Sequence, residues 1–146
     1  MTDDYCKNLK EKSPAIAWIH NISLNQQKYM KKKLSEHNVD HEMRYVLFIY
    51  EHPNSSQQDL VNMFGLSKGN IAKTLKKLED QNYIKREINP DNRREYIINT
   101  TEKGNEFAPK FRELSREWEK NVGISEEDAE FKEKLISIAE NAVKLI

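Results

Sequence analysis

The chain of 146 residues contains few of the residues that break helices or form cross-links: one cysteine (Cys6), four glycines and four prolines. One cysteine excludes an internal disulfide, and a cytoplasmic location is therefore expected. No apolar run approaches the roughly 20 residues of a membrane-spanning helix. The first residues show neither a basic start nor an apolar stretch, so we expect no signal peptide. The chain is long enough for one compact domain or two closely packed parts.

The chain also lacks net charge, with 24 basic and 24 acidic residues. Overall charge therefore does not predict a nucleic-acid partner, but its distribution along the chain is uneven. Residues 66–94 hold eight bases and four acids, whereas residues 101–146 hold eight bases and eleven acids. A basic middle and an acidic C-terminal part indicate that a polyanion would be bound by the middle.

Apolar spacing predicts a mainly α (α+β) protein. A first helix is expected over 13–35, with Ser13 as N-cap and Pro14 at the first helical position. A second helix, capped by Asp40, covers "HEMRYVLFIYEH", although the run "YVLFIY" also has strand propensity.

Two further helices are predicted in the C-terminal part. One begins at Thr100 or Thr101, and Pro109 should kink it or delay its regular start. The other is expected to be capped by Ser125, with an apolar seam from Phe131 onward.

The stretch "SQQDLVNMFGLSKGNIAKTLKKLE" predicts a helix-turn-helix. Ser56 and Asp59 form a capping-box pattern that starts a short helix, and Gly65 suits the left-handed conformation of a tight turn. Ser67 can cap the second helix, whose core side would carry Ile71, Leu75 and Leu78. The following "YIKREINPDNRREYII" reads as two short strands around a turn with Pro90, a basic hairpin in the position of a wing.

The second helix of this motif carries lysines on its outward side with no acid before Glu79. Such a row is unfavourable unless DNA phosphates are its partners, although a solvated lysine face is the alternative. Residues in the first turn of a recognition helix read bases. The predicted DNA-binding residues are Ser67, Lys68, Gly69, Asn70, Lys73, Thr74, Lys77, Arg93 and Arg94. For Asn70 two roles stay open: pairing with adenine, or completing the cap at Ser67.

The segment from "SQQDLVNMFGLSKGNIAKTLKKLE" through "NPDNRR" to "TEKG" resembles the winged helix-turn-helix core of the MarR family of transcriptional regulators. The resemblance implies a homodimer in which each recognition helix enters a major groove and each wing a minor groove. It also implies a pocket for a small aromatic or phenolic effector, which Trp18, Tyr29, Tyr45, Phe48 and Trp118 would line unless they belong to the core or the dimer interface.

The wing departs from the family pattern, which usually has Asp-x-Arg. In the gapless register Asn92 stands in the position of the aspartate and Arg94 in that of the arginine. A shift by one residue pairs Asp91 with Arg93 instead, but it breaks the "TEKG" match. Which arginine enters the groove is left open.

The resemblance divides the chain into an N-terminal dimerisation helix (1–38), a DNA-binding region (39–100) and C-terminal dimerisation helices (101–146). Within the DNA-binding region the recognition helix is expected at about 67–80 and the wing at about 83–98. A lone copy would expose many apolar residues, which predicts a homodimer. The predicted dimerisation residues are Ile16, Ile19, Phe131, Leu135, Ile138 and Ala142.

The expected function is a sequence-specific DNA-binding regulator, a repressor released by an effector, acting on a pseudo-palindromic operator. The alternative is a winged-helix module without effector, for architectural DNA binding or protein assembly. No enzyme motif, cofactor or metal is predicted. A metal site at His37 and His41 would need more Cys or His ligands, and a redox role for Cys6 is a minor alternative to an incidental thiol.

Overall fold

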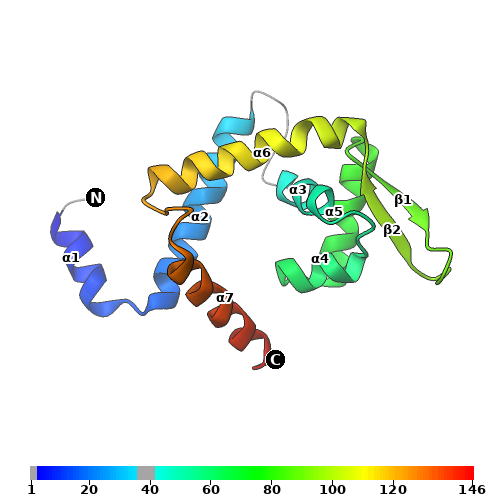
Figure 1. The fold of residues 1–146 in the computed structure, drawn as a ribbon. Helices are drawn as coiled ribbons and strands as arrows, with labels where there is room; N and C mark the ends of the chain where they lie inside the picture. The colour runs from blue at the N-terminus through cyan, green and yellow to red at the C-terminus, as the bar shows by residue number, and fades with distance from the viewer. Residues whose placement is uncertain (1–2, 36–41) are drawn as a thin grey trace. The chain divides into compact units, whose positions relative to one another are not determined.

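The structure is a computed structural model that describes residues 3–35 and 42–146, without the side chains of residues 3–6 and 9. It divides into two compact units, residues 1–114 and 115–146, which are described separately. The elements are α1 (Asp3–Lys12), α2 (Ala15–Leu34), α3 (Met43–Glu51), α4 (Gln57–Phe64), α5 (Lys68–Asp80), β1 (Ile84–Ile88), β2 (Tyr96–Thr100), α6 (Glu102–Asn121) and α7 (Ala129–Val143) (Figure 1).

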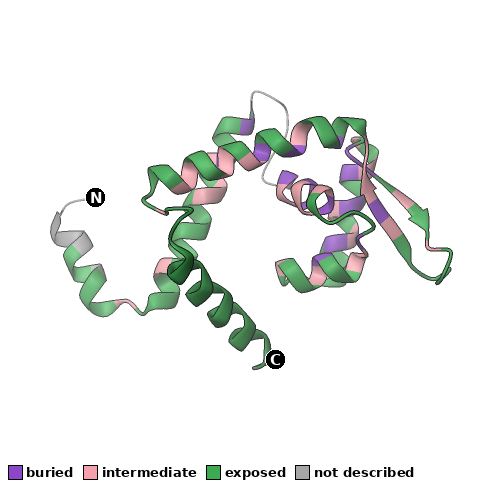
Figure 2. Ribbon diagram, viewed as in Figure 1, coloured by how far each residue is buried: buried purple, intermediate pink, exposed green. Residues whose placement is uncertain are grey.

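The core of the first unit is built by apolar residues from α2, α3, α4, α5, both strands and the first part of α6 (Figure 2). The predicted inward residues Ile71, Leu75 and Leu78 of α5 are each at most 1% exposed. The other fully buried side chains include Met30, Leu34, Met43, Val46, Ile49, Leu60, Ile84 and Ile98. Helical spacing therefore identified the face of α5 that packs inward, and this fixes which face points to solvent.

The helix-turn-helix has the predicted local structure. Ser56 and Asp59 form a complete capping box at the start of α4. Gly65 ends α4 with φ 63°, the left-handed conformation that glycine adopts without strain. The hydroxyl of Ser67 accepts a hydrogen bond from the backbone N–H of Asn70 at 3.2 Å, which caps α5.

The hairpin is antiparallel, with Ile84 opposite Thr100 and Ile88 opposite Tyr96. Two asparagines shape its turn. The side-chain oxygen of Asn89 accepts from the backbone N–H of Asp91 at 2.9 Å, and that of Asn92 accepts from the backbone N–H of Arg94 at 3.2 Å. These local bonds favour the turn and fix the backbone that carries the arginines.

The start of α6 explains the "TEKG" stretch. The hydroxyl of Thr101 donates to the carbonyl of Asn82 at 2.6 Å and accepts from the N–H of Gly104 at 3.2 Å. Gly104 is buried, and a Cβ there would overlap the carbonyl oxygen of Tyr83. A glycine therefore lets α6 approach Tyr83, in the segment between α5 and β1, closely.

Three expectations about the N-terminal helices and Pro109 need correction. Residues 3–12, for which no helix was predicted, form α1; acids at its start and lysines in its last turn suit the helix dipole. The N-cap of α2 is Pro14 rather than Ser13, because Pro14 is extended (ψ 157°) and the helix begins at Ala15. α6 begins at Glu102 and contains Pro109 in its interior, so its start is not delayed, while a kink at Pro109 stays a prediction. The expected cap Asp40 lies outside the described residues.

The second unit contains the end of α6, a turn with Gly123 at φ 89°, and α7. The N-cap of α7 is Asp128 rather than Ser125: its carboxylate accepts from the N–H of Phe131 at 3.0 Å. The Ser125 hydroxyl instead accepts from the N–H of Glu127, within the loop that precedes α7. Every residue of α7, which lies wholly within the described chain, is exposed (Figure 2).

Candidate nucleic-acid interface

The recognition helix presents a polar, largely exposed face opposite its buried stripe. Asn70, Lys73 and Lys77 are exposed on this helix, and Thr74 is half-buried. Ser67, Lys68 and Gly69 are exposed at its start. The cap at Ser67 uses the backbone N–H of Asn70, so the capping role considered for the Asn70 amide is wrong. That amide takes part in none of the hydrogen bonds of the described residues and points to a role outside the fold.

Gly69 has no structural reason to be glycine. Among the described residues no heavy atom lies within 4 Å of the place where its Cβ would stand, and its φ is in the ordinary helical range. Glycine inside a helix lowers stability by roughly 0.5–1 kcal/mol relative to alanine. Its presence on the outward side, in the first turn, is consistent with close approach to a partner surface.

The lysines of this helix are not all without acidic partners, which corrects the sequence-based expectation. The Nζ atom of Lys77 lies 2.6 Å from a carboxylate oxygen of Glu42, and that of Lys76 lies 3.3 Å from Asp80. Glu42 is separated from Lys77 by a long stretch of chain, so helical spacing gave no sign of this pair. Within the described residues Lys68 and Lys73 form no ion pair, and they remain the cations of α5 without an acidic partner.

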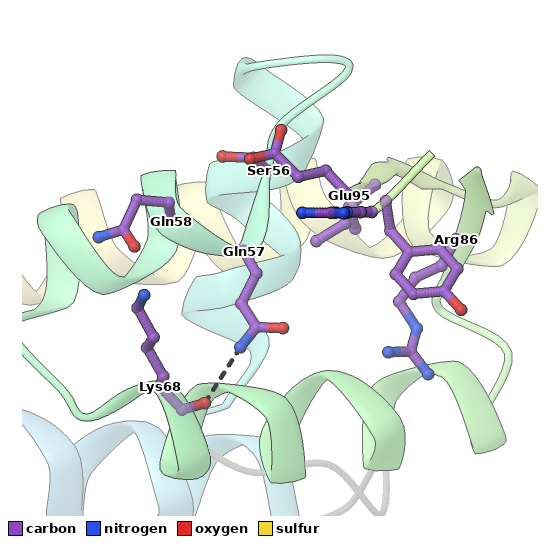
Figure 3. A pocket seen from close by; sticks show the side chains of 9 residues that line it. Ser56, Gln57, Gln58, Lys68, Arg86 and Glu95 are labelled. Atoms are coloured by element: carbon purple, nitrogen blue, oxygen red, sulfur yellow. Dashed lines mark hydrogen bonds between the residues drawn. The ribbon is translucent and has the colours of Figure 1, made fainter. Parts of the chain in front are cut away.

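The wing and the helix-turn-helix line a hollow of about 240 Å³, on the face of the hairpin that carries the buried Ile98 (Figure 3). Lys68 and Gln57 lie on one side of it, and Arg86 lies on the other (Figure 3). The Gln57 amide donates to the carbonyl of Lys68 at 3.1 Å, which joins α4 to α5. Arg94, the wing arginine of the gapless register, also lines this hollow. The hollow is lined by more cationic than acidic side chains, which suits it to an anionic partner.

Sequence reasoning did not select Gln57 or Arg86 for this surface. Arg86 lies in β1 and is bonded to Glu79 of α5. The alternation of "IKREI" alone could have placed Arg86 on the same face of the hairpin as Ile84 and Ile88, but not beside the recognition helix. Arg93 is exposed at the wing turn and does not line the hollow.

A second hollow, of about 570 Å³, lies between the start of α3 and the recognition helix. Its lining combines cations, one acid and apolar groups: Glu42, Arg44, Tyr45, Leu66, Asn70, Lys73, Thr74 and Lys77. The Arg44 guanidinium lies over the rings of Tyr45 and Phe64, 4.9 and 5.4 Å from their centroids. This hollow brings together four of the predicted DNA-binding residues with residues of α3.

The predicted dimerisation residues belong to other elements than the predicted DNA-binding residues. Ile16 and Ile19 are exposed on α2, and Phe131, Leu135, Ile138 and Ala142 on α7.

No cluster of three potential metal ligands occurs within the described residues. His37 and His41 lie outside those residues; Cys6 belongs to α1, rather than preceding the first helix, and its side chain is not described. In the described chain, none of the helices has the length and apolar character to cross a membrane.

A helix-turn-helix with an exposed polar recognition helix, followed directly by a basic hairpin, defines a winged helix-turn-helix DNA-binding protein.

The model of the MarR family of transcriptional regulators matches residues 40–96 of this chain. It is 27% identical over 128 residues to the HTH-type transcriptional regulator BilQ of Clostridioides difficile (strain CD3), covering 87% of this chain and 86% of that protein. The crystal structure of MarR is 28% identical, with a TM-score of 0.78 over 92% of this chain and 94% of that one. The S. aureus MepR–DNA complex, 18% identical with a TM-score of 0.74 over 92% of this chain and all of that one (100%), shares the fold.

These comparisons confirm the fold class expected from the sequence and bear out its resemblance to the MarR family. The chain is a DNA-binding transcriptional regulator. Members of the MarR family are transcriptional regulators and not enzymes. The individual DNA-contacting residues, the division into dimerisation and DNA-binding regions, and the dimer residues stay predictions.

Proposed function

We propose that the protein binds a pseudo-palindromic operator as a homodimer, each copy placing α5 in a major groove and its wing in the adjacent minor groove. The observation that carries this proposal is the exposed Asn70 amide beside Lys73, on the helix face opposite the buried stripe. An asparagine amide can pair with both N6 and N7 of adenine, and a lysine supplies a phosphate contact. MepR, which shares the fold, was solved with DNA bound, and this supports the same use of the fold here.

The DNA backbone that separates the major groove from the minor groove would pass over the hollow between α5 and the wing. A helix in a major groove and a hairpin in the neighbouring minor groove are separated by one phosphate backbone. Lys68 lines this hollow from α5 and would contact that backbone. Arg94 is the proposed minor-groove arginine, because Asn92 accepts its backbone N–H and so takes an orienting role in place of the family aspartate.

The dimer is supported by apolar groups that the single chain leaves in water. Ile16 of α2 is 67% exposed, and Phe131, Leu135 and Ile138 of α7 are 40–43% exposed. Exposed apolar rows on helices indicate association when they are this extensive. In a two-fold dimer the two recognition helices would reach half-sites about 10 bp apart, centre to centre.

A direct test of the dimer is light scattering of the wild type and of the Leu135→Glu variant at micromolar concentration. We expect twice the chain mass for the wild type and the mass of one chain for the variant. The matched control is Ile88→Glu, which changes an exposed apolar residue of the wing (62% exposed) and should leave the dimer intact. A monomeric wild type would contradict the proposal.

The regulation we propose is repression relieved by a small aromatic or phenolic anion in the hollow between α3 and α5. Arg44 and Lys73 supply positive charge there, Lys77 being paired with Glu42, while Tyr45 and Leu66 supply apolar surface. Because Asn70 and Lys73 line the same hollow, a ligand held there would obstruct their contacts with DNA. Such a regulator acts in the cytoplasm, where its operator is.

Gel-shift experiments on the DNA upstream of the protein's own gene test this function. Specific binding that weakens on addition of salicylate is the expected result. Specific binding without salicylate sensitivity would remove the proposed effector class and leave the operator binding. Equal binding to any duplex would favour the alternative of an architectural module without regulatory input.

A further inference from the structure

We propose that Glu42 sets the affinity for DNA by holding Lys77 in an ion pair at the edge of the recognition face. This inference rests on the proposed contact of α5 with DNA and adds the residue just before α3 to the determinants of that binding. Glu42 immediately precedes α3, and its carboxylate reaches across to the second half of α5. It is the acidic residue in the lining of a hollow that also contains Arg44, Asn70, Lys73 and Lys77.

The geometry of the pair favours its persistence. The Lys77 Nζ atom and the Glu42 carboxylate oxygen are 2.6 Å apart, and the Glu42 side chain is only 21% exposed, so solvent screens the attraction less than at an open surface. The pair between Lys76 and Asp80 differs: the atoms are 3.3 Å apart and both side chains are more than 60% exposed. Pairs of that kind contribute little. Lys77 is therefore committed to an acid in the free protein, whereas Lys73 is not.

Two consequences for DNA follow from this arrangement. A phosphate that approaches Lys77 must compete with a carboxylate that already contacts this lysine. Lys77 therefore neutralises the phosphate poorly, and few counterions are released from the DNA. The carboxylate also adds a negative charge beside the path of the phosphate backbone, and like charges at an interface oppose association. Both effects lower the affinity for all sequences alike, because phosphate contacts carry no sequence information.

The test is the salt dependence of DNA binding by E42Q, K77A and the double variant E42Q/K77A. The probes are one duplex selected from a random library with the wild type and one random-sequence duplex of the same length. E42Q keeps the shape of the side chain and removes its charge. We expect its affinity at low salt to rise about tenfold for both duplexes, and the slope of log K against log salt to steepen by about 1.8 per dimer, for one added phosphate contact in each subunit.

The double variant distinguishes release of Lys77 from a general change of charge. Without Lys77 no cation is freed, so E42Q/K77A should bind no more than about twofold more tightly than K77A, a residual from the carboxylate charge. The matched control is D80N, which removes one acid from an ion pair with the neighbouring Lys76. It should change affinity much less than E42Q. Melting curves of each variant verify folding, and E42A replaces E42Q if the latter is destabilised.

Each result decides the matter. E42Q with unchanged or reduced affinity overturns the inference, as does a tenfold gain that persists in the K77A background or is equalled by D80N. Those results would leave the proposed function intact, because the wild type would still bind its selected duplex. A wild type that binds neither duplex would overturn both.

Discussion

The Arg86 guanidinium of β1 donates two hydrogen bonds to one carboxylate oxygen of Glu79 in α5, from Nε at 2.8 Å and from Nη2 at 2.5 Å. Both side chains are partly shielded, being 24% and 35% exposed. The guanidinium also lies over the ring of Tyr96 in β2, 5.3 Å from its centroid. The pair joins α5 to β1 of the wing, the two elements that we propose contact DNA.

Removing the charge of Glu79 should loosen this connection. We expect Glu79→Gln to lower the free energy of unfolding by about 1 kcal/mol, since a bonded, half-buried pair contributes more than an exposed one. Urea unfolding measures the change. Asp80→Asn is the matched control, because Asp80 is the next residue and its pair with Lys76 is well exposed. Equal free energies of unfolding for the two variants would show that the pair between Arg86 and Glu79 stabilises the fold no more than the exposed pair between Lys76 and Asp80.

Gly69→Ala should separate stability from binding. The added methyl group meets no atom of the described chain, and alanine favours a helix over glycine by about 0.5–1 kcal/mol, so unfolding should become harder by that amount. If the DNA surface approaches Gly69 closely, the same variant should bind DNA more weakly. Thermal melting and gel shift on one preparation measure both. A stabilised variant with unchanged affinity would refute the close approach at Gly69.

Gly104→Ala makes the same chemical change in a buried position and should have the opposite effect on stability. Its methyl group would overlap the carbonyl oxygen of Tyr83 and crowd Thr100. Overpacking of this kind costs roughly 1–3 kcal/mol, because backbone must move. We expect the melting temperature to fall for Gly104→Ala and to rise for Gly69→Ala. A fall for both would indicate that the two glycines are needed for the same, structural reason.

The local structure of the DNA-binding region could be predicted because neighbouring residues determine it. Ser56 with Asp59, Gly65, and Ser67 act within one turn of a helix, and the stripe of Ile71, Leu75 and Leu78 follows from the helical period. The start of α7 was misplaced for a related reason: Ser125 and Asp128 both have capping side chains, and sequence does not decide between them.

The pairing of charges could not be predicted, because it depends on elements that meet only in the fold. Lys77 was expected to lack an acid partner, since its helix carries no acid before Glu79. Its partner Glu42 lies just before α3, far from α5 in the sequence. Arg86 was treated as one of many basic residues, although its bond to Glu79 positions the wing. The sequence indicated where cations are, and the structure shows which of them are already paired.

Lys73 and Lys77 should therefore differ in their contribution to DNA binding. Lys73 is exposed and forms no ion pair within the described residues, so Lys73→Ala should reduce the salt slope by roughly one unit for each subunit, on specific and random duplexes alike. Lys77→Ala in the wild-type background should reduce it less, because Glu42 already holds this lysine. Titrations at several salt concentrations give the slopes. Equal losses would mean that Lys77 leaves Glu42 when DNA binds.

Asn70→Ala tests whether this residue reads a base. The Ser67 cap accepts the backbone N–H of residue 70, which alanine retains, so the cap should persist and the melting temperature should stay the same or rise slightly. Loss of an amide paired with adenine should cost roughly 1–3 kcal/mol at one position of each half-site and relax the preference there. Selection of preferred sites from a random library with wild type and variant measures this directly. Lys73→Ala is the control, since loss of a phosphate contact weakens binding without altering the preferred bases. If Asn70→Ala selects the same base as the wild type at every position, the amide does not read the operator, and its exposure on α5 has another cause.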